Sequence, residues 1–351
     1  MAEPSARPRL PEPLAEPSAR PRRIVRDVAA AVGLAEGERG VDAVIATLAR
    51  LEPVSIRRVS RATELPVPIV ASVCGELRKR AVVAEERPAR LTDAGRALFA
   101  HGELSLPSSA ACRRCGGRSV VISDELHAVV RDVARLARAA PPPRLELDQC
   151  HCTVETKIRR VLALHAAGAL VGKRVLLLGD DDLVSLAIAS VVREFGSETT
   201  IARLVALDVD ERILALVREG LAAAPFPWVC VEHDLRVRLP EELVGGFDTI
   251  VTDPPYTIPA VRLFLSRAAE ALAGAGDVFL SFGSKRPGAA RLAQQAITEH
   301  GLVIRSLTRD FNEYVGAGVI GGTSHLYHLT ASEETRPLVG EFPGALYTAD
   351  A

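Results

Sequence analysis

The stretch VLLLGDDDLVSLAIASVVREFG at residues 175–196 decides the fold class of this chain. Its apolar opening over 175–179 is typical of a strand that is buried on both faces of a sheet. The apolar spacing that follows predicts a helix over 182–196. The same alternation continues to residue 330 and predicts an α/β fold with a doubly wound parallel sheet. Such sheets bind ligands at the carboxyl ends of their strands, so the residues that follow each strand are the first site candidates.

The other elements of this domain are expected in regular order. Further strands are expected at 204–208, 228–234, 247–256, 277–283, 302–311 and 324–330. Helices are expected at 153–167, 210–222, 259–273 and 287–300. We interpret residues 153–351 as one catalytic domain.

The composition is that of an ordinary globular protein. Of 351 residues, 48% are hydrophobic and 25% are charged, which excludes wholesale disorder and a coiled-coil rod. Neither an apolar run long enough to span a membrane nor an apolar secretory signal is visible. We therefore expect a cytoplasmic protein without a membrane partner.

The net charge of −1 conceals two halves of opposite sign. Residues 1–152 carry 24 Lys and Arg against 19 Asp and Glu, whereas the remainder carries 19 against 25. This division favours two modules with different partners. The acidic half is better suited to a cationic substrate than to a phosphate-rich one.

The first 104 residues are expected to form a tail and a small helical domain. Residues 1–23 are rich in Pro and Arg, repeat the octamer AEPSARPR, and predict a disordered tail. Residues 24–104 predict helices at 41–51, 55–63 and 67–83, then a turn, a strand, and a helix capped by Thr92. This order, with RLTDAGRALF at 90–99, resembles a winged helix-turn-helix.

The function of this winged-helix-like domain has two interpretations. Its third helix ends in Arg78, Lys79 and Arg80, which could contact DNA phosphates. The same cations also suit a helix carboxyl end, and the domain could instead serve dimerisation or cover an active site. We do not expect a nucleic-acid partner, and we expect a homodimer through this domain.

Residues 105–152 are interpreted as a connector that carries two cysteine pairs. One amphipathic helix is expected at 123–139. Cys112, Cys115, Cys150 and Cys152 could form a four-thiolate zinc site. Free thiols or a redox pair are the alternatives for these cysteines.

Acidic residues follow four of the predicted strands. They are Asp180, Asp181 and Asp182 after the first, Asp208 and Asp210 after the second, Asp234 after the third and Asp253 after the fourth. The position of Asp208 is that of an acid that binds a ribose diol, and Asp234 is placed to accept from an adenine amino group. Any one of these acids could instead cap a helix, but the set predicts a nucleoside site.

The first turn argues against a dinucleotide. A pyrophosphate would need glycines where Gly179 is followed by three aspartates, and their charges would repel it. NAD and FAD are therefore disfavoured, and a cationic sulfonium nucleoside is favoured. Decarboxylated S-adenosylmethionine suits the turn better than S-adenosylmethionine, whose own carboxylate would approach these acids.

The sequence Asp253-Pro254-Pro255-Tyr256 follows the fourth strand and resembles the D/N-P-P-Y/F motif of amino-group methyltransferases. In that motif the acid and a neighbouring carbonyl hold a nucleophilic nitrogen. The prolines preorganise these acceptors, and the aromatic ring packs against the substrate and stabilises a developing cation.

The combined motifs resemble the branched-chain polyamine synthases, the N4-bis(aminopropyl)spermidine synthases. The resemblance lies in LDQCHCTVET (147–156), GDDDLVSLA (179–187), LDVDERIL (207–214), FDTIVTDPPYT (247–257) and FNEYV (311–315). It implies transfer of aminopropyl groups from decarboxylated S-adenosylmethionine to the secondary amine of spermidine or a similar linear polyamine. Methylthioadenosine would be released.

The resemblance and the charges together suggest roles for these residues. We expect Asp182 to deprotonate or hold the amine, with Asp181 and Asp253 beside it. Tyr256, Glu313 and Tyr314 are expected to bind the acceptor. The nucleoside is expected to contact Gly179, Asp180, Asp208, Asp210, Asp234 and Pro254.

Two other functions are compatible with parts of the sequence. An S-adenosylmethionine-dependent N-methyltransferase would share the sheet and the DPPY motif, but the acidic first turn argues against it. A winged-helix transcription regulator with a ligand-sensing domain would need a continuous basic face on its third helix and salt-dependent duplex binding.

Overall fold

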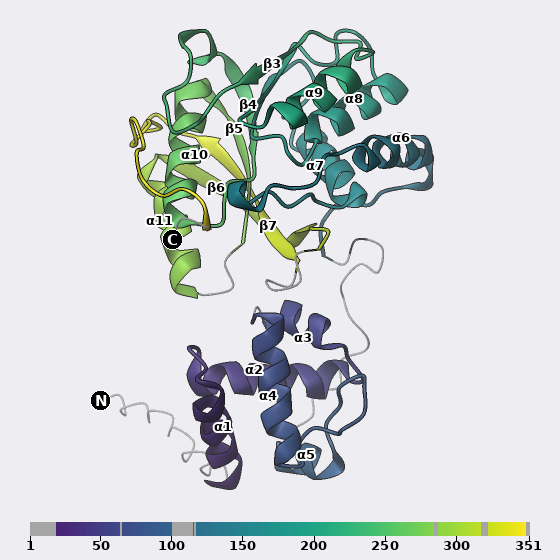
Figure 1. The fold of residues 1–351 in the computed structure, drawn as a ribbon, viewed down its shortest axis with the longest axis vertical. Helices are drawn as coiled ribbons and strands as arrows, with labels where there is room; N and C mark the ends of the chain where they lie inside the picture. Colours follow the sequence, from purple (N-terminus) through teal and green to yellow (C-terminus); the bar gives the residue numbers. More distant parts are fainter. Residues whose placement is uncertain are drawn as a thin grey trace, which may run out of the picture. The chain divides into compact units, whose positions relative to one another are not determined.

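The structure, a computed structural model, describes residues 19–63, 65–99, 115, 117–283, 287–316 and 322–348. The chain divides into two compact units, Met1–Ser105 and Leu106–Ala351 (Figure 1). Within the described ranges, no helix is long and apolar enough to cross a membrane.

The first unit is a helical domain with its own core. Its helices are α1 (Ala19–Val32), α2 (Gly37–Leu51), α3 (Ile56–Thr63), α4 (Val67–Lys79) and α5 (Asp93–Leu98). Their apolar faces form one cluster. The segment between α4 and α5 forms two antiparallel bridges: Val83↔Leu91 within the segment, and Val54↔Ala89 to the chain between α2 and α3.

Two sequence expectations for this unit need correction. Residues 19–23 were expected in the disordered tail, but α1 begins at Ala19, and its apolar face buries Val25 and Val28. The rest of that tail lies outside the described residues. The helix expected over 67–83 ends at Lys79, because the chain leaves helical geometry at Arg80 and takes a positive φ of 55° at Ala81.

The basic cluster at the end of α4 has partners within its own neighbourhood. The Nε of Arg78 donates to the carbonyl oxygen of Ala84 at 3.1 Å. Lys79 and Arg80 both pair with Glu76, at 2.6 and 2.5 Å. One carboxylate, that of Glu76, therefore balances part of the positive charge of these three residues.

The second unit contains a seven-stranded sheet of order β3-β2-β1-β4-β5-β7-β6. The strands are β1 (Arg174–Leu178), β2 (Arg203–Asp208), β3 (Trp228–Glu232), β4 (Phe247–Thr252), β5 (Leu272–Phe282), β6 (Leu302–Glu313) and β7 (Thr323–Ala331). The first five pair in parallel, which confirms the expected α/β class. The sheet is not fully parallel as was expected, because β7 runs antiparallel to both of its neighbours, β5 and β6. No helix of the described chain separates β6 from β7, so β7 returns in the opposite direction.

Helices cover both faces of this sheet (Figure 1). They are α6 (His127–Arg138), α7 (Val154–Ala166), α8 (Val184–Phe195), α9 (Glu211–Leu221), α10 (Ile258–Ala271) and α11 (Pro287–Glu299). Side chains of β1 alternate between the two faces: Val175 and Leu177 join the core under α6 to α9, and Leu176 and Leu178 join the core under α10 and α11. This period of two, with a core on each face, explains why β1 is apolar at every position from Val175 to Leu178.

The strand order places a switch point between β1 and β4. The chain leaves β1 toward β2 and β3, then returns to β4 on the other side of β1. Loops on the carboxyl side of these two strands diverge, which leaves room for a ligand. The acidic turn 179–182 and the DPPY sequence 253–256 follow β1 and β4, so the fold brings both motifs to this point.

The central strand gives a direct test of the core. Leu177→Ala should lower the free energy of unfolding by about 3 kcal/mol, because Leu177 is 1% exposed and its removal leaves a cavity. Denaturant unfolding followed by the fluorescence of Trp228, the single tryptophan, reports the change in this unit. Leu145→Ala is the control, since Leu145 is 76% exposed and should lose less than about 0.5 kcal/mol. Equal losses in the two variants would contradict the packing described.

Candidate active site

The first aspartate of the acidic turn is a helix cap. Asp180 is fully buried, and its Oδ1 accepts from the backbone N–H groups of Val184 and Ser185, at 2.8 and 3.3 Å. Its Oδ2 accepts from the hydroxyl of Ser185. Burial raises the pKa of Asp180 to about 7, against the lowering effect of Ser185. Asp180 thus holds the start of α8 and does not line the cavity, contrary to its expected contact with the nucleoside.

The third aspartate is held by cations of α7. Asp182 Oδ2 accepts from Arg160 Nη1 at 2.7 Å, and Oδ1 accepts from the backbone N–H of Cys152 at 2.6 Å. Lys157 Nζ donates to the carbonyl oxygen of Asp182 at 2.6 Å. Burial alone would raise the pKa of Asp182, but Arg160 and Lys157 outweigh burial and lower it to about 2. Asp182 is a buried ion-pair partner, and it does not line the cavity where it was expected to meet the amine.

Asp181, between them, is the acid of this turn that lines the cavity. Its backbone carbonyl oxygen lies 2.9 Å from His151 Nδ1. No hydrogen-bond donor of the described chain contacts its carboxylate. Burial raises the pKa of Asp181 well above its usual range, and the charges of Asp182, Asp208 and Asp253 add to the rise. The positive charge of Lys157 opposes this rise but does not outweigh it, so Asp181 is poised to take a proton or to bind a cation.

The acids after β2 have different environments. Asp208 lines the cavity, and its two oxygens accept from the backbone N–H groups of Asp180 and Asp210, each at 2.8 Å. Asp210 caps α9 and pairs with Arg212 at 2.6 Å. The hydrogen bonds from Arg212 lower the pKa of Asp210 to about 2. Asp210 also accepts from Gln149 Nε2 at 3.1 Å and orients this cavity residue, but it does not itself line the cavity as expected.

Asp253 joins the two motif loops. Its Oδ2 accepts from Arg160 Nη2 at 2.7 Å and from the Tyr314 hydroxyl at 2.6 Å. Its Oδ1 is buried without a partner among the described residues, and Asp253 lines the cavity. Burial raises the pKa of Asp253 to about 7, with Arg160 opposing the rise and Asp182 adding to it. One oxygen of this carboxylate is therefore held by the protein, and the other is left for a ligand.

The aromatic residues after β4 and β6 lie together next to Asp253. Tyr256 stacks on Phe282 with ring centroids 5.6 Å apart, and meets Tyr314 edge-on at 6.4 Å. The hydroxyl of Tyr314 lies 2.9 Å from Ser324 Oγ. The structure thus brings Tyr256 and Tyr314 to the motif loops, as expected.

Glu313 and Pro254 lie differently from the expectation. Glu313 Oε1 accepts from Arg118 Nη2 at 2.7 Å, and neither it nor the buried Pro254 lines the cavity. The neighbouring Pro255 lines the cavity instead. Side chains alternate along an extended segment, so Glu313 faces away from the Tyr314 side of β6.

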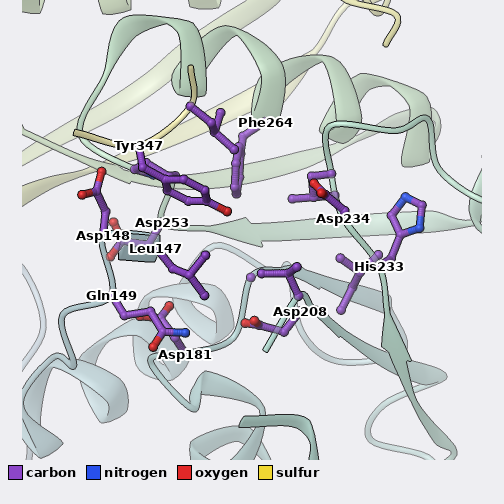
Figure 2. Close-up of a pocket in the computed structure, with 16 residues that line it drawn as sticks. Leu147, Asp148, Gln149, Asp181, Asp208, His233, Asp234, Asp253, Phe264 and Tyr347 are labelled. Carbon is purple, nitrogen blue, oxygen red and sulfur yellow. The ribbon is translucent and has the colours of Figure 1, made fainter. Parts of the chain in front are cut away.

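The cavity lies on the carboxyl side of β1, β2 and β4 (Figure 2). Its lining comprises Leu147, Asp148, Gln149, Gly179, Asp181, Leu207, Asp208, Val209, His233, Asp234, Leu235, Asp253, Pro255, Phe264, Leu346 and Tyr347. Figure 2 shows the rings of Phe264 and Tyr347 opposite Asp208 and Asp181. Apolar walls with carboxylates at the edges suit a flat ring that carries hydroxyl and amino groups.

Asp234 and His233 form the end of the cavity beyond Asp208 (Figure 2). Asp234 pairs with Arg236 at 2.6 Å. The Nε2 of His233 is buried and has no partner among the described residues. Both side chains are available to polar atoms of a bound ring.

The chain's carboxyl-terminal segment closes one wall. The carbonyl oxygen of Leu346 accepts from Thr257 Oγ1 at 2.9 Å, and Thr348 N donates to Asp148 Oδ2 at 2.8 Å. These bonds hold Leu346 and Tyr347 against the cavity. No local pattern in the sequence signals this contact, because its partners lie about a hundred or more residues away.

Sequence reasoning also missed the cations of α7 and the segment before it. Lys157 and Arg160 are three residues apart, which places them on one face of a helix, and both are buried. The cavity is also lined by Leu147, Asp148 and Gln149. The family resemblance drew on LDQCHCTVET but gave these three residues no role. A pair of cations on a helix that precedes an acidic turn is the signal that could have found them.

The expected zinc site is not supported. The described residues contain no group of three His, Cys, Asp or Glu side chains that could hold a metal ion, and Cys112 lies outside them. Cys150 and Cys152 are free thiols. Burial raises the pKa of Cys150 to about 11 and that of Cys152 still further, which disfavours the thiolate that zinc requires.

The sequence profile of the family described as "Branched-chain polyamine synthase A C-terminal domain" matches residues 128–336. This chain belongs to the branched-chain polyamine synthase family. The resemblance seen in the motifs is therefore confirmed.

Curated and solved relatives agree with this family. An uncharacterized protein of Methanocaldococcus jannaschii is 36% identical over 87% of this chain and 77% of its own length. The N(4)-bis(aminopropyl)spermidine synthase of Thermococcus kodakarensis is 32% identical over 76% of this chain and 75% of its own. The crystal structure of the Thermus thermophilus branched-chain polyamine synthase has a TM-score of 0.72, is 26% identical, and covers 94% of this chain and 98% of its own. That structure is a complex with N4-aminopropylspermidine and 5′-methylthioadenosine.

The different surroundings of Asp181 and Asp182 predict opposite effects on stability. Asp182→Asn should lower the free energy of unfolding by about 3 kcal/mol at neutral pH, because it leaves buried Arg160 undercompensated. Asp181→Asn should leave this free energy unchanged or raise it, because burial and the neighbouring acids disfavour ionisation of Asp181 in the folded state, and the substitution removes that cost. Thermal and denaturant unfolding of the two variants beside the wild type would measure both changes.

The pH dependence of these effects also differs in sign. With its folded pKa lowered to about 2, Asp182 contributes stability that is present above the ordinary value of 3.8 and is lost as the pH falls toward 2. With its folded pKa raised, Asp181 lowers stability increasingly as the pH rises above 3.8. An Asp181→Asn variant less stable at pH 7 than Asp182→Asn would contradict these assignments.

Proposed function

We propose that this protein is an aminopropyltransferase. It moves aminopropyl groups from decarboxylated S-adenosylmethionine to the secondary amine of spermidine or a related linear polyamine, and releases methylthioadenosine. Membership of the family and the two products bound to the Thermus thermophilus relative support this activity. The observation that carries the proposal here is that Asp181 and Asp253 both line the cavity, and that neither the carboxylate of Asp181 nor Asp253 Oδ1 has a hydrogen-bond partner among the described residues.

The donor would occupy the cavity with its adenosine between the walls formed by Phe264, Tyr347 and Leu207. Asp208 lies at the position of a ribose-binding acid, and Asp234 is next to the ring end. The sulfonium and the aminopropyl ammonium would then lie toward Asp181 and Asp253. A donor with an α-carboxylate would bring a third negative charge to these two acids, which favours the decarboxylated form.

The acceptor nitrogen must be neutral before it attacks. We assign the proton-accepting role to Asp181 instead of Asp182, since both oxygens of Asp182 are occupied by Arg160 and Cys152. The nitrogen lone pair forms a bond to the aminopropyl carbon, the carbon–sulfur bond breaks with its electrons passing to sulfur, and the amine proton passes to Asp181. The raised pKa of Asp181 suits it to accept this proton.

A second transfer would act on a tertiary amine and give a quaternary ammonium. This step releases no proton, so its product charge must be balanced by fixed groups. Asp253 and the rings of Tyr256 and Tyr314 supply a carboxylate and aromatic faces next to the open Oδ1. The same groups therefore support one or two additions at one nitrogen.

The proposal also covers the fold of the first unit, the cellular location and the oligomeric state. We infer that the first unit is a winged helix, because α2, α3 and α4 are followed by a bridged hairpin-like segment and a short helix. We place the enzyme in the cytoplasm, where free thiols such as those of Cys150 and Cys152 are maintained. Homodimerisation through the first unit stays a prediction.

Incubation with decarboxylated S-adenosylmethionine and spermidine, followed by mass spectrometry of the amines, tests the activity. The wild type should add one or two aminopropyl increments, and Asp181→Asn should transfer at least about 100-fold more slowly, because the base is lost. Asp181→Asn should still bind methylthioadenosine. Asp234→Asn is the matched control, an acid at the far end of the same cavity, and should weaken nucleoside binding more than it slows transfer.

Two results would contradict the proposal. The first is an absence of any aminopropyl increment while methylthioadenosine binds normally. The second is methylation of the amine when S-adenosylmethionine replaces the decarboxylated donor, which would favour the N-methyltransferase alternative.

A further inference from the structure

We propose that Arg160 is a positioning residue for aminopropyl transfer, because its guanidinium joins the acidic turn after β1 to the DPPY loop after β4 and fixes their separation. This inference rests on the proposed function and extends it to a residue outside both motifs. Arg160 lies on α7, which precedes β1, and is 3% exposed.

Every nitrogen of the Arg160 guanidinium has a partner. Nη1 donates to Asp182 Oδ2 and Nη2 to Asp253 Oδ2, each at 2.7 Å. Nε donates to Asn312 Oδ1 at 2.9 Å. Nη2 also lies 3.3 Å from the Tyr314 hydroxyl. One side chain thus contacts the loops after β1 and β4 and the strand β6.

The partners of Arg160 are themselves held from the neighbouring strand. Asn312 Nδ2 donates to Ser324 Oγ at 2.9 Å, and Ser324 Oγ lies 2.9 Å from the Tyr314 hydroxyl. Ser324, which lies on β7, therefore orients Asn312 and Tyr314 around the guanidinium. The planar group is therefore fixed on three sides, which is the condition for precise placement of the carboxylates it binds.

An arginine suits this place better than a lysine. Its rigid fork presents five N–H donors, so it binds two carboxylates and an amide oxygen at once. A lysine ammonium is a point charge on a flexible stem and would not hold both loops in one geometry. Arg160 thus binds Asp182 and one oxygen of Asp253, whereas Asp253 Oδ1 has no partner among the described residues. Asp181 and Asp253 both line the cavity.

The cation also sets the charge state of the two carboxylates. Arg160 lowers the pKa of both Asp182 and Asp253. The titratable groups that face this cluster from the surrounding elements are Cys152, Lys157, Asp181, Asp182, Asp208, Asp253, Tyr256 and Tyr314. Loss of the cation would let Asp253 keep its proton to higher pH, so the acid limb of the rate profile should move upward.

Steady-state kinetics of Arg160→Lys and Arg160→Gln over pH 5–9, with decarboxylated S-adenosylmethionine and spermidine, test the inference. In Arg160→Lys, kcat should fall about 100-fold, because the loops lose their fixed separation, while the dissociation constant of methylthioadenosine stays within about twofold. In Arg160→Gln the acid limb of kcat/KM should move up by about one pH unit. Arg160→Lys retains a buried cation and decides the case if Arg160→Gln fails to fold.

Arg174→Gln is the matched control. Arg174 pairs with Asp248 at 2.7 Å and so joins β1 and β4 at their opposite, amino ends. This variant should keep the wild-type kcat and pH profile. Wild-type and Arg174→Gln enzymes that fail to transfer would overturn the proposed function. If the wild type transfers, two results would overturn the role of Arg160 alone. One is a kcat of Arg160→Lys within threefold of the wild-type value. The other is an Arg160→Gln enzyme that is slower but whose acid limb has not moved.

Discussion

Carboxylates crowded at the carboxyl ends of β1, β2 and β4 are the constraint on which the rest of this site depends. Buried negative charges close together are unstable unless each is balanced. The fold balances most of them: the start of α8 binds Asp180, Arg160 and Lys157 surround Asp182, and backbone N–H groups bind Asp208. Asp181 is the member of this group that lines the cavity without such a partner.

This unequal distribution connects stability with function. The balanced acids are structural, and they hold the turn after β1 in a shape in which Asp181 faces the cavity. The remaining negative potential is then available to a sulfonium nucleoside and a polyamine, both of which are cations. A site with every acid paired would be more stable and would bind these substrates less well, which is the usual conflict between activity and stability.

Periodicity was sufficient to predict the sheet and its motif loops. Four consecutive apolar residues in β1 and the acids after each parallel strand are local signals, and local signals locate strand ends. The assignment of roles within Asp180-Asp181-Asp182 was beyond the sequence, because three identical residues differ only in orientation. Leu183 has a positive φ of 55°, and this turn directs Asp182 toward α7 and leaves Asp181 at the cavity.

Long-range contacts account for most of what sequence reasoning missed. Phe264 comes from α10 and Tyr347 from the carboxyl-terminal segment, and neither is near a motif. Arg160 acts on Asp253, 93 residues away, and no spacing rule links such positions. The resemblance of FNEYV to the family suggested an acceptor-binding role for Glu313 beside Tyr314. In the structure Glu313 pairs with Arg118, because successive residues of an extended strand face opposite sides.

The central claim is that Asp181, whose carboxylate has no hydrogen-bond donor in the described chain, is the acid that contacts the polyamine. Calorimetric titration of spermidine into the methylthioadenosine-bound enzyme at pH 7, in buffers of different ionisation enthalpy, measures the protons released on binding. The account predicts that the wild type releases protons, because the arriving ammonium groups drive the proton from Asp181, and that Asp181→Asn releases fewer and binds spermidine more weakly. Equal proton release and equal affinity in the two proteins would contradict it.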